Sequence, residues 1–258
     1  MHIYIYDSFI NKKKYEAAIA QIETRITDLG LNGKIIRLDI MNSVFDSIAE
    51  EIKKGAKTIV VVGDDKIFNQ AVNALACLQA EEPLARTIPL GFIPLGTKSI
   101  LAPFFGIQPS VDACDILSAR RVERLNLGRV NQSFFLAQAT ISAEQTKIEI
   151  DQNYSIEILS GGEIYVINLP LLLDWPQEIK VSPQDNSLEL FIKTKKGKFL
   201  PFQSEPSQPS VFNFNKLLIT SPANKQILLD NVLPVDLPAE ISLASEKINL
   251  IVGKNRAF

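Results

Sequence analysis

Histidine and cysteine, which carry much of the nucleophilic and zinc chemistry of proteins, are scarce in this sequence. The 258 residues include one histidine, His2, and two cysteines, Cys77 and Cys114. His2 lies at the extreme N-terminus, where we expect the edge of a strand, and with no other histidine a Ser-His-Asp triad, a Cys-His dyad and a zinc site with several histidines are excluded. Two isolated cysteines in apolar helical surroundings are typical of buried thiols in a reducing compartment. Any chemistry therefore has to use carboxylates, lysines, backbone amides or a bound cation.

Long apolar runs and an excess of one charge are also absent. No apolar run approaches the ~20 residues that a membrane-spanning helix requires, and the N-terminus, MHIYIYDSF, lacks the pattern of a signal peptide. The formal net charge is -2, from 27 basic and 29 acidic residues mixed along the chain. That balance offers no basic surface for a nucleic-acid backbone. We therefore expect a cytoplasmic globular protein that does not bind nucleic acid.

Residues 1–121 alternate between strand-like and helix-like periodicity. Predicted strands and helices follow one another at residues 3–6, 12–29, 35–38, 43–54, 58–62, 67–79, 90–93, 98–105 and 110–119. Thr58–Val62 is an unbroken apolar run, typical of a central strand that is covered on both faces. Regular alternation of this kind predicts an α/β domain with a doubly wound, mainly parallel sheet.

After residue 121 short β-branched and aromatic runs recur, and no convincing amphipathic helix lies between them. We predict a β-sandwich or related all-β domain over residues 122–258. Its last two predicted strands are Glu240–Leu243 and Lys247–Val252, and the final strand is free to return to the first domain.

Two turns at strand ends predict a ligand site. Gly63-Asp64-Asp65-Lys66 follows one strand, and Pro94-Leu95-Gly96-Thr97-Lys98 follows the next. Ligands of open parallel sheets bind beyond the carboxyl ends of the strands, and free amides at a helix start favour an anion. Each turn alone is equally typical of a helix cap. Two such turns at successive strand ends favour a nucleotide-type site.

These turns resemble motifs of the bacterial diacylglycerol kinase and sphingosine kinase type of lipid kinase, a family related to NAD kinases. That family has Gly-Gly-Asp-Gly-Thr-Leu-Asn-Glu-x-x-Asn-Gly-Leu after a strand, and here the matching positions are Gly63, Asp65, Asn69, Asn73 and Leu75. The family continues with Pro-Leu-Gly-Thr, which is similar to Pro94–Thr97. Further on, Gly128–Asn131 and Phe134–Leu136 resemble its hairpin, and Leu229-Asp230-Asn231-Val232 lies where it has Asp-Gly-Glu. The resemblance covers nearly the whole chain in order.

Several positions depart from the family pattern. Asp64 and Lys66 replace glycines that let a backbone approach phosphates, and Ile67 replaces the threonine. Ser99-Ile100 stand in place of Asn-Asp, Asn126 in place of an aspartate, and Val232 in place of the glutamate. Asp64 also brings a negative charge to the expected position of a polyphosphate.

The resemblance implies ATP-dependent phosphoryl transfer to a lipid hydroxyl, with ATP and Mg²⁺ as cofactors. It implies a catalytic role for Asp65 and Asp230, the latter as candidate base. The nucleotide-binding residues that it implies are Gly63, Asp64, Asp65, Lys66, Asn69, Gly96 and Thr97, while the metal ligands stay unassigned.

The departures leave open an alternative, a catalytically impaired member of the family that acts as a binding or regulatory module. A kinase of soluble dinucleotides is a third hypothesis, disfavoured because the second motif matches lipid kinases better. A Rossmann dehydrogenase is disfavoured because no Gly-x-Gly-x-x-Gly follows the first strand. Partners implied by the family are a nucleotide and a membrane lipid, so peripheral contact with the inner membrane surface is open. The basic stretch Lys193–Lys198 is either a solvated hairpin tip or a contact with anionic headgroups.

Overall fold

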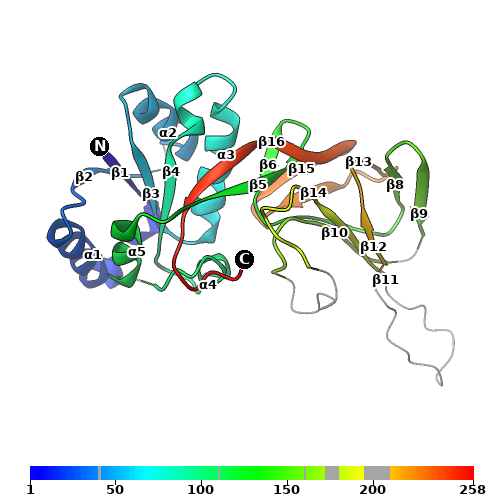
Figure 1. Cartoon of the computed structure of the whole chain (residues 1–258). Coiled ribbons are helices and arrows are strands. Elements are labelled where there is room, and N and C mark those ends of the chain that lie inside the picture. The colour runs from blue at the N-terminus through cyan, green and yellow to red at the C-terminus, as the bar shows by residue number, and fades with distance from the viewer. Residues whose placement is uncertain (40–41, 110, 160, 172–179, 195–209) are drawn as a thin grey trace. The chain divides into compact units, whose positions relative to one another are not determined.

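The computed structural model describes residues 1–258 except 40–41, 110, 160, 172–179 and 195–209. The chain divides into two compact units, which are described separately. Unit 1 contains Met1–Leu125 and Glu246–Phe258, and unit 2 contains Asn126–Ser245. Two strands, β5 (Val122–Val130) and β16 (Ala239–Ile251), belong partly to each unit (Figure 1). Most of the basic stretch 193–198 lies outside the described residues.

Unit 1 is built on a parallel sheet with the strand order β2-β1-β3-β4-β16. Besides β16, its strands are β1 (His2–Tyr6), β2 (Gly33–Arg37), β3 (Thr58–Gly63) and β4 (Pro89–Pro94). All six residues of β3 are buried between its neighbours, which confirms the predicted central strand. The chain passes from β1 to β2 on one side and then to β3 on the other. The strand order therefore reverses between β1 and β3, where open α/β sheets bind their ligands.

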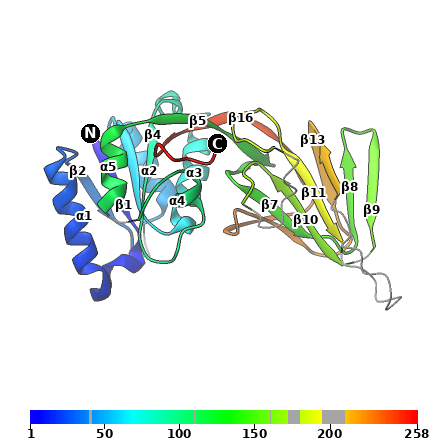
Figure 2. The same cartoon turned by 60° about the horizontal axis from the view of Figure 1, so that its bottom comes forward.

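Helices cover both faces of this sheet (Figure 2). They are α1 (Glu16–Asp28), α2 (Val44–Lys53), α3 (Asp65–Leu78), α4 (Leu101–Phe104) and α5 (Val111–Ala119), with short 3-10 turns at Ser8–Asn11, Lys13–Tyr15 and Pro83–Arg86. Gly91 of β4 faces α5, because an added Cβ would lie 2.3 Å from Leu117. The next residue, Phe92, faces the other way and stacks on Phe68 of α3, with ring centroids 4.5 Å apart. Successive residues of β4 point to opposite faces of the sheet, so this strand contacts a helix on each face.

The predicted helix at 98–105 is wrong in extent, because only Leu101–Phe104 is helical. The N-cap of this helix is Ile100, and Ser99 Oγ just before it accepts a hydrogen bond from the Ala102 amide at 2.8 Å. Gly106, with φ +68°, ends it in the left-handed conformation that favours glycine.

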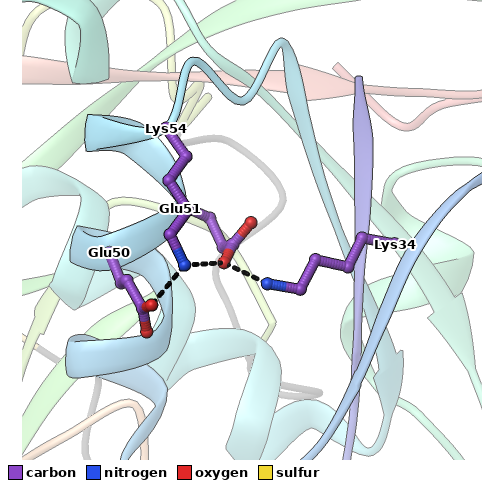
Figure 3. A network of polar contacts seen from close by, with 4 residues as sticks. All are labelled: Lys34, Glu50, Glu51 and Lys54. Atoms are coloured by element: carbon purple, nitrogen blue, oxygen red, sulfur yellow. Dashed lines mark hydrogen bonds and ion pairs between the residues drawn. The ribbon is translucent and has the colours of Figure 1, made fainter.

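A network of ion pairs joins α2 to the edge strand β2 (Figure 3). Lys34 Nζ on β2 lies 2.6 Å from Oε1 of Glu51, and Lys54 Nζ lies 3.4 Å from the same oxygen. Lys54 also pairs with Glu50. The side chain of Glu51 is only 1% exposed, whereas that of Lys34 is 43% exposed. A buried carboxylate is therefore compensated by lysines that keep contact with water.

Unit 2 is an antiparallel β-sandwich, as predicted. One layer has the order β16-β13-β8-β9 and the other β12-β11-β10-β7-β14-β15. The strands are β7 (Gln138–Ser142), β8 (Thr146–Ile150), β9 (Tyr154–Ile158), β10 (Gly162–Ile167), β11 (Glu189–Thr194), β12 (Ser210–Asn213), β13 (Lys216–Thr220), β14 (Gln226–Leu229) and β15 (Leu233–Asp236). Aliphatic side chains of both layers, among them Val166, Leu190 and Leu217, form one buried core.

The family-like hairpin near residue 130 is formed by β5 and β6 (Ser133–Phe135). Gly128 pairs with Phe135, and a Cβ on Gly128 would lie 2.0 Å from the Phe135 ring. The predicted split of the C-terminal segment into two strands is wrong, because β16 runs unbroken from Ala239 to Ile251. It pairs with β13 in unit 2 and with β4 in unit 1.

Candidate functional site

Three loops meet at the carboxyl ends of β1, β3 and β4 in unit 1. The Asp7 amide donates to Val62 O at 3.0 Å, which ties the β1 loop to β3. The Leu95 amide donates to Gly63 O at 2.7 Å, which ties the β4 loop to β3. Gly63 itself is buried, and a Cβ there would lie 2.7 Å from Ile67 and 3.0 Å from Asp7. The predicted loop residues Gly63 and Gly96 therefore belong to one constellation at the point where the strand order reverses.

Asp64 is the N-cap of α3. Its Oδ1 accepts hydrogen bonds from the amides of Lys66 at 3.0 Å and of Ile67 at 3.2 Å. These are the free amides that would bind a phosphate at the start of a helix. The chain's own carboxylate therefore occupies the anion position, in the manner of an ordinary aspartate cap.

Asp65, the first residue of α3, joins this loop to the loop after β4. Its carboxylate accepts a hydrogen bond from the Ser99 hydroxyl and one from the Ile100 amide at 2.7 Å. The Leu101 amide approaches the same carboxylate at 3.4 Å. The structure thus brings Asp65 together with the second motif. Both of its carboxylate oxygens accept hydrogen bonds from residues of that motif.

Phe9 lies against Gly96. A Cβ on Gly96 would meet the Phe9 ring at 2.5 Å, and Gly96 has φ +112°, a conformation that L side chains rarely adopt. Phe9 also contacts Tyr15 edge-on, with centroids 5.5 Å apart. An aromatic ring therefore lies close to one side of Gly96, while Gly96 itself is exposed.

The remaining predicted residues of unit 1 surround this constellation. Lys66 and Thr97 are exposed, and Asn69 is 8% exposed on the buried side of α3. The residues predicted for nucleotide binding are thus grouped in one unit, while their assignment to a nucleotide stays a prediction.

Asp230, the predicted base, belongs to unit 2 and lies in the tight turn between β14 and β15. Its carboxylate accepts hydrogen bonds from the amides of Leu136, Ala137 and Gln138 at 2.7, 2.8 and 2.9 Å. Asp230 and Asn231 have φ +49° and +58°. Asparagine tolerates the left-handed region, so Asn231 fits the position where the family has glycine. In this unit Asp230 fastens the turn to the loop between β6 and β7.

Burial raises the pKa of the Asp230 carboxyl to about 6, although the three amide donors favour its ionised form. Asn126 replaces a family aspartate, and its carboxamide is fully buried without a hydrogen-bond partner in the described part of the chain. An aspartate there would place a charge in the same interior, so asparagine removes a desolvation penalty.

The site residues do not fit ATP and Mg²⁺ as the family pattern requires. The Asp64 carboxylate accepts from the loop amides, the Phe9 ring lies against one side of Gly96, and the Asp65 carboxylate is hydrogen-bonded to the second loop. Among the described residues no group of three or more His, Cys, Asp or Glu side chains is placed to hold a metal ion.

Two contributors to this geometry were missed by sequence reasoning. Phe9 comes from a loop with no family-like motif, and its contact with Gly96 spans 87 positions of the chain, 96 minus 9. The amides of 136–138 carry no sequence signal at all, because every residue other than proline has one. The sequence did point to the position of Ser99, because this residue lies in the second family-like motif.

A parallel sheet with helices on both faces, a capped loop where the strand order reverses, and an antiparallel sandwich define a protein with an α/β unit and a β-sandwich unit. Residues 3–130 match the family described as diacylglycerol kinase catalytic domain. The N-terminal half of the chain thus belongs to the diacylglycerol kinase catalytic domain family, as the sequence motifs predicted.

Solved structures share the fold over both units. A diacylglycerol kinase from Bacillus anthracis strain Sterne is 18% identical with a TM-score of 0.76, and the match covers 98% of this chain and 97% of that chain. A second structure from this strain, provisionally described as a diacylglycerol kinase, is 16% identical with a TM-score of 0.78 and coverage of 99% and 98%. A comparison with curated proteins gives no significant match. No helix in the described ranges is long and apolar enough to cross a membrane.

Proposed function

We propose that this chain is a diacylglycerol-kinase-like protein that acts as a binding or regulatory module and transfers no phosphate from ATP. The observation that carries this proposal is the cap on α3. The Asp64 carboxylate accepts hydrogen bonds from the Lys66 and Ile67 amides, so these donors are not available to a phosphate. Its negative charge would also repel the phosphate. The ring of Phe9 against Gly96 adds a steric obstacle at the adjoining loop.

Calorimetric titration with Mg-ATP tests this proposal. We expect no measurable binding to the wild-type chain. The triple variant Asp64→Gly/Lys66→Gly/Ile67→Thr restores the family loop and should gain affinity, because its amides are released and a repulsive charge is removed. Asp112→Asn, which removes an exposed aspartate from the first turn of α5, is the matched control and should leave binding unchanged. Tight Mg-ATP binding by the wild-type chain would contradict the proposal.

Retained kinase activity is the second candidate. It is supported by Asp65, which still joins the two motifs, and by the Asp230 carboxyl, whose pKa of about 6 suits a general base near neutral pH. In this case ATP, with Mg²⁺, would donate phosphate to the hydroxyl of a membrane lipid such as diacylglycerol.

This candidate predicts Mg²⁺-dependent transfer of labelled phosphate from ATP to diacylglycerol-like lipids. Asp65→Asn and Asp230→Asn should each abolish the transfer, and Asp112→Asn should not. Absence of transfer over a broad lipid panel, from protein shown to be folded, would count against the kinase and for the binding module.

A further inference from the structure

The segment Gly253–Phe258 follows β16 and packs on the short helix α4 of unit 1 (Figure 1). The Gly253 amide donates a hydrogen bond to Phe105 O at 2.9 Å. The Ala257 amide donates to Phe104 O at the same distance. These two bonds attach both ends of the segment to the last turn of α4, and we call Gly253–Phe258 the strap.

The side chains of Phe258 and Arg256 fix the far end of the strap. The Phe258 ring stacks on Phe104, with centroids 5.6 Å apart, and meets Phe105 edge-on at 6.3 Å. Arg256 forms an ion pair of 2.7 Å with Glu123 of β5, and its guanidinium lies 5.8 Å from the centroid of the Phe258 ring. Aromatic and cation–π contacts of this kind are favourable beyond the area that they bury. The strap therefore has a defined position on α4.

Two glycines allow the backbones of the strap and of α4 to touch. A Cβ on Gly106 would lie 2.7 Å from the Arg256 nitrogen, and a Cβ on Gly253 would lie 2.0 Å from Gly106 O. The φ of Gly253 is not positive, so an alanine there is compatible with the backbone and excluded only by this contact. A single methyl group at Gly253 would thus push the strap away from α4.

Helix α4 is held at both ends by residues outside it. With four residues it forms about one turn, which is too short to be stable alone. Just before it, the Ser99 hydroxyl and the Ile100 amide donate to the Asp65 carboxylate. Just after its last turn, the strap is attached. The loop that carries Gly96 and Thr97 is therefore connected to the strap through α4.

We propose that the strap is a conformational device that controls the candidate site of unit 1. When it is docked on α4, the loop 95–100 stays bonded to Asp65, and when it is released, this loop is free to move. Release need not open the buried core of the sheet, because the strap lies at the surface, with exposed side chains at Lys254, Asn255 and Ala257. The proposal rests on the proposed function only in taking the loop 95–100 as part of the binding site.

Hydrogen exchange at single amides tests this proposal without a nucleotide. Phe258→Ala removes the stacked ring, and Gly253→Ala forces the strap off α4. Each should speed exchange of the Ile100 and Ala102 amides at least about tenfold, because their bonds to Asp65 and Ser99 open more often. The amides of β3 should exchange as in the wild type. Phe258→Tyr, which keeps the ring, and Lys254→Ala, at an exposed position of the strap, are the controls and should change nothing.

The reverse measurement starts from the site. Coupling between two positions is reciprocal, so Asp65→Ala should speed exchange of the Gly253 and Ala257 amides. If Gly253→Ala unfolds unit 1, which fast exchange throughout β3 would reveal, Phe258→Ala and Asp65→Ala decide the question. A strap variant that speeds only the Gly253 and Ala257 amides, and leaves Ile100 as in the wild type, overturns the proposal. Binding of Mg-ATP by the wild-type chain would contradict the proposed function and leave this result untouched, so the two proposals fail separately.

Discussion

Asp65 holds two loops of unit 1 together through one carboxylate. The Ser99 hydroxyl and the Ile100 amide donate to its two oxygens, and Ser99 Oγ in turn accepts from the Ala102 amide in the first turn of α4. A hydrogen bond to a charged acceptor is worth more than a neutral one, and the partial exposure of Asp65 reduces that worth. The position therefore has a structural role that is independent of any nucleotide.

A double-mutant cycle measures this role. We expect Asp65→Ala and Ser99→Ala each to destabilise the protein, with a coupling of about 1 kcal/mol between them, because each removes the same hydrogen bond. Urea denaturation gives the free energies of unfolding. Lys98→Ala, at the exposed neighbouring position, should be additive with Asp65→Ala. Equal coupling in both cycles would refute the assigned contact.

Asp230 should make stability depend on pH in an unusual direction for an aspartate. Burial raises its pKa from 3.8 to about 6, so between these values the native state binds a proton that the unfolded chain releases. The group's contribution to the free energy of unfolding is therefore complete below about pH 4 and falls as the pH rises through about 6. Relative to Asp230→Asn, the wild type should lose stability over this window. Urea titrations measure the difference, and a difference that rises with pH would contradict the burial of this carboxyl. Asn231→Gly, which keeps the turn and the titrating group, should follow the wild type.

At the scale of elements, two ion pairs allow a matched comparison. Lys34–Glu51 and Lys147–Glu149 have the same N–O distance of 2.6 Å and similarly exposed lysines, 43% and 48%. Their carboxylates differ, since Glu51 is 1% exposed and Glu149 39%. Removing a partner from a buried charge is costly, whereas exposed pairs contribute little.

We expect Lys34→Met to lower the free energy of unfolding by about 1–3 kcal/mol, moderated by the remaining partner Lys54. Lys147→Met should change it by less than about 0.5 kcal/mol. Chemical denaturation of the two variants under identical conditions provides the measurement. Similar values for both would mean that the network of Figure 3 is incidental to the attachment of α2.

The sequence predicted best those helices and strands whose own apolar side chains form a clear pattern. The run Thr58–Val62 is apolar on both faces, so it could only be a central strand, and α2 and α3 carry clear apolar stripes. The unbroken course of β16 was missed because Ser245, Glu246 and Lys247 interrupt its apolar alternation. A strand is held by its backbone, and no glycine, proline or asparagine stands at these positions to turn it.

The sequence predicted where the candidate site lies, but not which residues contact one another in it. Strand ends and glycines fixed where the loops after β3 and β4 lie, and the cap by Asp64 follows from local spacing. The approach of Phe9 to Gly96 and of the 136–138 amides to Asp230 depends on contacts between distant segments. Periodicity and spacing describe residues that are neighbours along the chain, so they do not predict contacts between distant segments.

At the scale of the whole molecule, unit 1 depends on the end of the chain. Ile248, Leu250, Ile251 and Val252 are at most 2% exposed. Burying one aliphatic side chain stabilises by roughly 1.5–3 kcal/mol, so four approach the total stability of a typical domain.

We therefore expect a chain that ends at Ser245 to lose cooperative unfolding of unit 1. A chain that ends at Lys254 keeps these four residues and loses the contact of Phe258 with Phe104, so it should fold with reduced stability. Circular dichroism melts and limited proteolysis distinguish the outcomes. An unchanged melting profile of the shorter chain would show that β16 is dispensable for the sheet.

The passage of β16 through both units also bears on biosynthesis. The ribosome completes β4 at Pro94 long before it makes Glu246–Phe258, and the 151 intervening residues, 95 to 245, include the whole of unit 2. At usual elongation rates this interval lasts roughly 8–30 s. During it the edge of β4 that later receives β16 has no native partner. The nascent chain thus carries an open parallel edge through most of its synthesis, a period in which chaperone contact or misassociation competes with folding.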